Sequence, residues 1–164
     1  MNHTAQPENT RDPRRMVTFT VGAEEFGVPI RSVREIVRMM KITAVPDTPA
    51  DIRGIVNLRG SVIPIVDLRR RFHVEHTQDP EDRRIVVLDM ADQAVGFLVD
   101  RVGRVLSVDN ERVNPPPERA TTASAPFIDG IVNLEDRLII LLDPGRLIAG
   151  ETCEKTGRPV SRAA

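Results

Sequence analysis

Short runs in which hydrophobic and polar positions alternate cover most of the chain, and this is the pattern of β-strands rather than of helices. The runs come in pairs that are separated by short turn-forming stretches, and each pair predicts a β-hairpin. These pairs are 17–21 with 26–30, 52–58 with 61–66, 85–90 with 95–99, and 131–134 with 138–142. Residues 139–142 are apolar without alternation, which predicts a strand that is covered on both faces where two modules meet.

Helix is expected at only a few places. Residues 30–36 have room for a single turn, and Asp67 and Asp143 each follow a strand in a good N-cap position for a short helix. Residues 114–117 read Asn-Pro-Pro-Pro, which cannot form a central strand or a helix. We interpret this proline-rich stretch as a linker between two halves of the chain.

The halves are indicated by an internal repeat. Residues 52–68 and 128–144 are identical at eight of seventeen positions at an offset of 76, and residues 26–37 and 95–106 share a weaker match at an offset of 69. Two blocks that recur in the same order indicate two copies of one unit. We therefore expect two small, twisted antiparallel barrels that pack on each other around a shared core.

Composition narrows the possible functions. The net charge of −1 argues against a protein that binds nucleic acid or an anionic membrane. The chain has no Trp or Tyr and only five Phe, so stacking of bases on aromatic side chains is nearly excluded.

The termini and the single cysteine indicate an intracellular protein. Residues 1–15 and 150–164 are polar and predict disordered tails around one patterned domain at 16–149. Cys153 has no partner for an internal disulfide, which is typical of a reducing cytoplasm. The N-terminal residues lack a signal peptide, and no apolar run is long enough to span a membrane.

The search for catalytic or metal-binding residues gives no convincing site. His73 and His76 are close in sequence, but they lie in a charged stretch that we interpret as a surface loop. Asp67 and Asp143 could form a carboxylate pair, but helix capping explains them better. We therefore expect no enzymatic activity, no cofactor and no metal.

The two copies of the repeat distinguish residues that the fold requires from residues that are candidates for binding. Residues that both copies share are explained by the fold, and Gly54 with Gly130 and Asn57 with Asn133 predict turns or bulges.

Exposed positions that differ between the copies are candidates for function. The tip Arg59-Gly60 becomes Glu135-Asp136, and Glu35 becomes Arg104. An arginine at a hairpin tip can present a planar, bidentate donor to a partner. Val33 and Ile36 flank Glu35 and are expected in the core more than at a contact.

The motif at 54–68, Gly-Ile-Val-Asn-Leu-Arg-Gly followed by Val62-Ile63-Pro64-Ile65-Val66-Asp67-Leu68, resembles the signature of the CheW-type coupling domain of bacterial chemotaxis. Residues 26–36 and 135–143 are similar to the same family, and the resemblance covers roughly residues 16–149.

This resemblance implies a mainly β protein with two SH3-like five-stranded antiparallel barrels on a shared core and few short helices. It implies a cytoplasmic, non-enzymatic adaptor between the cytoplasmic domain of chemoreceptors and the regulatory domain of the CheA histidine kinase. By motif position, Glu35 and Arg59 resemble family positions implicated in partner contacts, and Gly54 and Gly60 shape the loops there. With Val33 and Ile36 from the comparison of the copies, the candidate protein-binding residues are Val33, Glu35, Ile36, Gly54, Arg59 and Gly60.

Two alternatives remain at this point. One is a CheW-like scaffold of a chemosensory pathway with an output other than flagella. The other is a small-barrel module that binds proline-rich peptides, although such grooves are lined by aromatic residues that this chain lacks.

Overall fold

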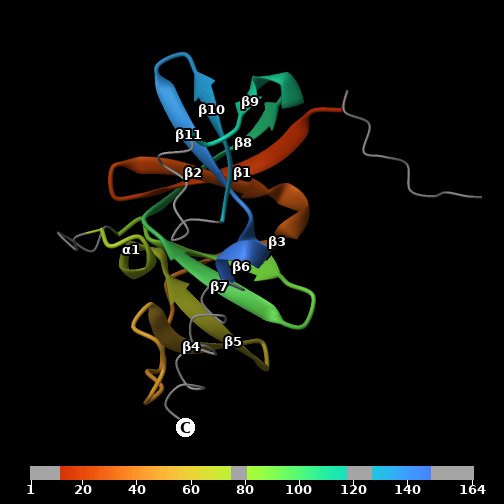
Figure 1. The fold of residues 1–164 in the computed structure, drawn as a ribbon. Coiled ribbons are helices and arrows are strands. Elements are labelled where there is room, and N and C mark those ends of the chain that lie inside the picture. Colours follow the sequence, from red (N-terminus) through yellow and green to blue (C-terminus); the bar gives the residue numbers. More distant parts are fainter. Residues whose placement is uncertain (1–11, 75–80, 118–126, 149–164) are drawn as a thin grey trace, which may run out of the picture.

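The described residues of the computed structural model, 12–74, 81–117 and 127–148, form two β-sheets and a few short helices (Figure 1). Sheet one has the order β8-β1-β2-β11-β10-β9, and sheet two has the order β3-β6-β7-β5-β4. The mainly β prediction is confirmed, with a sixth strand in sheet one.

Sheet one contains β1 (Arg14–Val21), β2 (Glu24–Pro29), β8 (Arg101–Val108), β9 (Val113–Asn114), β10 (Ile128–Leu134) and β11 (Arg137–Leu142). Sheet two contains β3 (Val33–Arg38), β4 (Ile52–Leu58), β5 (Ser61–Asp67), β6 (Arg84–Asp89) and β7 (Ala94–Val99). The helical elements are the 3-10 turns η1 (Ile30–Ser32) and η2 (Asn110–Arg112), the helix α1 (Leu68–Arg71) and a helical turn at 144–148.

The two copies of the repeat exchange strands. Copy one supplies β1 to β5 and copy two supplies β6 to β11, yet sheet one combines β1 and β2 with strands of copy two. In Figure 1 the red and orange N-terminal strands accordingly lie beside the blue C-terminal ones. The expectation that each copy forms its own module is therefore wrong, because the last strands of each copy pair with the first hairpin of the other.

The exchange creates one parallel strand pair in each sheet. β11 pairs with β2 in sheet one, and β5 pairs with β7 in sheet two, whereas the other pairings between the named strands are antiparallel. An all-antiparallel arrangement was expected from the hairpins, and it is wrong at these two junctions. Strands that meet from different copies need no hairpin connection, so either direction is open to them.

In both sheets, the chain that leaves one edge strand runs back to the opposite edge. Thr43 follows β3 and forms a bridge with Ile55 of β4, and Asn114 follows β8 and pairs with Ile131 of β10. These contacts bring together the edges that a five-stranded barrel would have to join, and barrel closure itself stays a prediction. Residues 114–117 belong to this return within copy two, so their interpretation as a linker between halves is wrong.

Apolar side chains gather in three clusters. A central cluster between the sheets includes Phe19, Phe26, Val86, Phe97 and Leu142. A second cluster is formed by residues of sheet two, and a third by residues of sheet one. In β11 the side chains of Ile139 and Leu141 enter the cluster of sheet one, while Leu142 enters the central cluster. The prediction that residues 139–142 are covered on both faces is confirmed.

The structure confirms both predicted helix caps and shortens the helical turn expected at 30–36. Asp67 accepts a hydrogen bond from the Arg69 backbone N–H at 3.0 Å, and Asp143 accepts one from Arg146 at 3.1 Å. Only 30–32 of the turn expected at 30–36 is helical, because Val33 begins a strand that pairs with β6.

The N-terminal boundary of the domain also moves. Arg14 and Arg15 were expected in the tail but lie in β1, where Arg14 forms an ion pair with Asp129 at 3.0 Å. The rest of the predicted tails falls almost entirely outside the described residues, and a compact unit at 16–149 stays a prediction. No helix in the described ranges has both the length and the apolar character that a membrane crossing requires.

The exchanged strands lead to a prediction about fragments. Residues 1–80 and 81–164, expressed separately, should each lack a cooperative thermal transition, because each sheet needs strands from both fragments. Mixing them should restore β-structure in far-UV circular dichroism. A cooperative transition in either isolated fragment would contradict the exchanged arrangement.

Candidate protein-docking surfaces

The turn between β4 and β5 holds Arg59 at the tip of a tight hairpin. Arg59 and Gly60 both have positive φ, 50° and 89°, which is the combination of a type I′ turn. Asn57 supports the turn, since its side-chain oxygen accepts a hydrogen bond from the Gly60 N–H at 2.9 Å. The turn role predicted for Asn57 and Gly60 is confirmed, whereas the positive φ of Arg59 was not anticipated. The Arg59 side chain is left 69% exposed.

Arg59 forms an ion pair with Glu35 of β3. β3 and β4 are the two edge strands of sheet two, so the pair spans from one edge of the sheet to the tip at the other. The sequence singled out both residues separately but did not predict their contact. Because the pair is largely exposed, it adds at most about 1 kcal/mol to stability.

A bulge in β3 sets the direction of the residues around Glu35. Val33 pairs with Leu88 and Glu35 with Val87, so Arg34 is the extra residue and forms an ion pair with Asp89. The hydrogen bond to Asp89 and its charge raise the pKa of Arg34, which therefore stays cationic.

The two apolar candidates in β3 have different environments. Val33 is half-buried against the central cluster, as expected for a core residue. Ile36 is 41% exposed, so the expectation that it lies in the core is not met, and it is available for contact.

Gly54 lies apart from this surface, inside the fold. It is buried in β4 at a bulge between Ile52 and Gly54, and its φ is 152°. A Cβ at this position would lie 2.3 Å from the carbonyl oxygen of Thr43. Gly130 takes the equivalent bulge in β10, which confirms the predicted bulge role of both glycines. Gly54 therefore shapes the edge contact rather than presenting a side chain.

The second copy has an equivalent surface with opposite charges. Glu135 also has positive φ, 54°, at the tip between β10 and β11, and Arg104 occupies the position of Glu35 in β8. In the described part of the chain these two residues do not form an ion pair. Arg137 instead binds both carboxylate oxygens of Glu25 at 3.0 and 2.5 Å, and this contact raises the pKa of Arg137.

Exposed apolar side chains occupy matched positions on both surfaces. Val62 is 62% exposed and its counterpart Leu138 is 57% exposed, while Ile36 and its counterpart Val105 are 41% and 47% exposed. Sequence reasoning missed Val62 and Leu138, although their positions next to the tips could have indicated them. We call Glu35, Ile36, Arg59 and Val62 the Arg59 surface, and Arg104, Val105, Glu135 and Leu138 the Glu135 surface.

The described residues contain no group of three His, Cys, Asp or Glu side chains that could hold a metal ion. His73 is exposed after α1, and His76 and Cys153 lie outside the described residues. What the described surface does offer is a patch of apolar and charged side chains around Arg59, together with the same kinds of exposed side chain at the matched positions of copy two, as in a protein-binding surface.

Comparison with known proteins decides the family. The model of the CheW-like domain matches residues 15–152. The chain belongs to this family. It is 34% identical to the chemotaxis protein CheW of Treponema pallidum over 94% of both chains, and 36% identical to that of Klebsiella aerogenes over 84% of this chain and 83% of the relative.

A solved structure is similar over most of the fold. The scaffolding protein TtCheW from Thermoanaerobacter tengcongensis matches with a TM-score of 0.73 and 36% identity over 80% of this chain and 89% of that one. The protein is thus a CheW-type adaptor of chemotaxis signal transduction, and this family consists of scaffolds without enzymatic activity.

The glycine contacts give a matched pair of substitutions. Gly54→Ala should lower the free energy of unfolding by about 3 kcal/mol, because the added methyl meets the Thr43 backbone at a strained φ. Gly60→Ala should cost only about 1 kcal/mol, since no atom lies within 4 Å of its Cβ position and only the φ is unfavourable. Urea unfolding of both variants tests this, and equal losses would show that the Thr43 contact does not constrain β4.

Proposed function

We propose that this CheW-type adaptor binds the cytoplasmic domain of a chemoreceptor and the regulatory domain of the CheA kinase at two different surfaces. One partner binds at the Arg59 surface on sheet two, and the other binds at the Glu135 surface on sheet one. The observation that carries this proposal is the reversal of charge at equivalent exposed positions of the two copies.

The equivalent placement supports two docking sites of similar shape. Arg59 and Glu135, at the two hairpin tips, both have positive φ, 50° and 54°. An exposed apolar residue follows each tip, Val62 in copy one and Leu138 in copy two. Similar shape with similar apolar content would allow one partner to bind both surfaces.

The charges prevent that outcome. The Arg59 surface presents a protruding cation above a partly covered carboxylate, whereas the Glu135 surface presents an anion at the tip and a cation in the strand. A partner that complements one arrangement meets like charges on the other, which costs affinity and separates the two partners. Bridging needs this separation, because both partners must bind at once.

The adaptor would reach the membrane only through such protein contacts. Each surface is small, so single contacts should be weak and should gain strength when an array of receptors supplies many of them. We therefore propose a position at the cytoplasmic side of receptor arrays, held by protein contacts alone.

Arg59→Ala should weaken the binding of one partner without unfolding the adaptor. Loss of the exposed pair with Glu35 should change stability by less than about 1 kcal/mol, whereas truncation of an interface arginine can cost about 2 kcal/mol or more. Calorimetric titration and thermal melting measure the two effects separately. Arg101→Ala is the control, because Arg101 is equally exposed and paired with Asp82 but lies outside both surfaces. Unchanged affinity for both partners would remove Arg59 from the proposed site.

A ternary binding assay tests the bridging arrangement. A receptor cytoplasmic fragment and the CheA regulatory domain should bind the adaptor together, with one of each per adaptor. Analytical ultracentrifugation with separately labelled partners would detect the complex. Strict competition between the partners would show one shared surface and contradict the proposal.

A further inference from the structure

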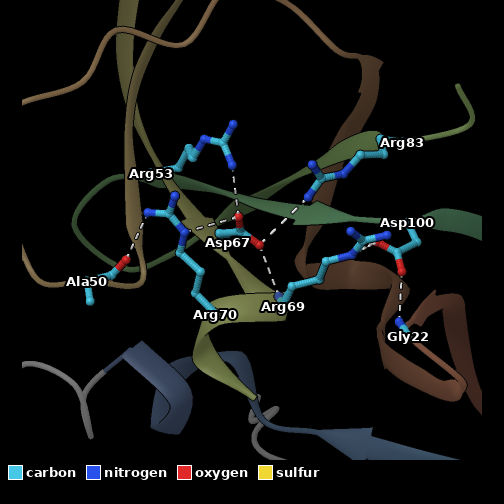
Figure 2. A network of polar contacts seen from close by, with 8 residues as sticks. All are labelled: Gly22, Ala50, Arg53, Asp67, Arg69, Arg70, Arg83 and Asp100. Atoms are coloured by element: carbon cyan, nitrogen blue, oxygen red, sulfur yellow. Dashed lines mark hydrogen bonds and ion pairs between the residues drawn. The ribbon is translucent and has the colours of Figure 1, made fainter. Parts of the chain in front are cut away.

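A buried carboxylate at the end of β5 is surrounded by arginines (Figure 2). The Asp67 side chain is 3% exposed, and its oxygens lie 3.3 Å from Arg53 Nη1 and 3.7 Å from both Arg70 Nε and Arg83 Nη2. Asp67 also caps α1 through the Arg69 backbone N–H. All of these residues lie in strands of sheet two or in the segments directly before or after them.

The Arg69 side chain points away from this carboxylate toward the other sheet. Its Nε donates to Asp100 Oδ1 at 2.7 Å, and the second carboxylate oxygen, Asp100 Oδ2, accepts from the Gly22 N–H at 2.7 Å (Figure 2). Asp100 lies where the chain passes from β7 in sheet two to β8 in sheet one, and Gly22 lies in the β1–β2 turn of sheet one. A continuous polar chain therefore joins the end of β5 to a hairpin of the opposite sheet.

The internal repeat shows that the fold does not require this connection in both copies. Asp143 also caps its helical turn, through the backbone N–H three residues on rather than two. Gly145 stands in the position of Arg69, and Arg31 in that of Asp100. The capped turn thus forms in copy two without the Arg–Asp pair. The connection is an addition to one side of a duplicated structure.

The physical properties of the pair differ from those of the apolar contact around it. The Arg69 and Asp100 side chains are 7% and 11% exposed, and an apolar pair of the same volume would stabilise such a site equally well or better. Apolar burial in the central cluster is non-directional and permits small rotations of one sheet on the other. Two short charge-assisted hydrogen bonds that the Asp100 carboxylate accepts, by contrast, fix both distance and direction.

We infer that Arg69 is a positioning residue, which with Asp100 fixes the orientation of sheet one relative to sheet two. Its functional consequence rests on the proposed function: the orientation sets the spacing of the Arg59 and Glu135 surfaces. Each surface keeps its own shape without the pair, but the two partners are then no longer held at the separation that simultaneous binding needs.

The test measures the distance between the sheets in the full-length protein. Gln93→Cys, in the turn between β6 and β7 of sheet two, and Ser107→Cys, in β8 of sheet one, carry spin labels at exposed positions in a Cys153→Ser background. Pulsed electron resonance gives their distance distribution. The variant combines Arg69→Met with Asp100→Asn, so that neither member of the pair remains as a buried charge without the other, and the Gly22 N–H keeps an acceptor. Arg146→Met is a control for removal of an arginine next to a capping carboxylate, because Arg146 pairs with Asp143 in the other copy but does not connect the sheets.

The double variant should retain a cooperative melting transition but show a shifted or widened distance distribution, while the control matches the unsubstituted protein. Arg69→Lys keeps the charge but loses the planar guanidinium donor, so its distance distribution should lie between those of the double variant and the unsubstituted protein. If the double variant does not fold, Arg69→Lys replaces it in the test. A distribution that is the same in all variants would overturn the inference.

Binding measurements on unlabelled variants test the functional consequence. The double variant should bind each partner alone as the unsubstituted protein does, and should lose about tenfold in affinity for the second partner once the first is bound. A widened distribution with unchanged ternary binding would overturn the link between orientation and docking. The distance measurement uses no partner, so failure of the proposed function would leave it as an independent result.

Discussion

The central apolar cluster between the two sheets is the constraint on which the rest of the structure depends. Several strands that line it also contribute side chains to the cluster of their own sheet, and these strands are apolar on both faces. In β6, Val86 and Leu88 enter the central cluster while Ile85 and Val87 enter the cluster of sheet two. Each such side chain contributes about 1.5–3 kcal/mol on burial. The strand exchange places strands of both copies in this cluster, so neither copy has a complete core alone.

The residues that are available to bind a partner therefore lie at positions whose side chains are not buried in these clusters. The edge strand β3 alternates between half-buried and exposed residues, and β8 is exposed at most of its positions. The hairpin tips at Arg59 and Glu135 contribute no side chain to the clusters. The charge at Arg59 and at Glu35 can therefore be reversed in the second copy, while Gly54 and Asn57 are kept and the core positions stay apolar. The duplication has preserved the residues that determine the fold and altered those at the exposed tips and edges.

The sequence predicted the hairpins, the caps at Asp67 and Asp143, and the bulge and turn roles of Gly54 and Asn57, because each depends on residues close in sequence. It could not predict the strand exchange, since a repeat shows that two copies exist but not which strands of each pair. The Glu35–Arg59 contact depends on the return of the chain from β3 to the opposite edge, which no local pattern records. The Arg69–Asp100 pair depends in the same way on the approach of the two sheets.

The central claim is that each sheet presents its own docking surface. Hydrogen exchange of the backbone amides, measured by mass spectrometry on the full-length protein with each partner separately, tests it most directly. The account predicts that one partner slows exchange in peptides from 33–38 and 57–62, and that the other slows exchange in peptides from 101–108 and 133–138. Protection of the same peptides by the receptor fragment and by the CheA regulatory domain would contradict it.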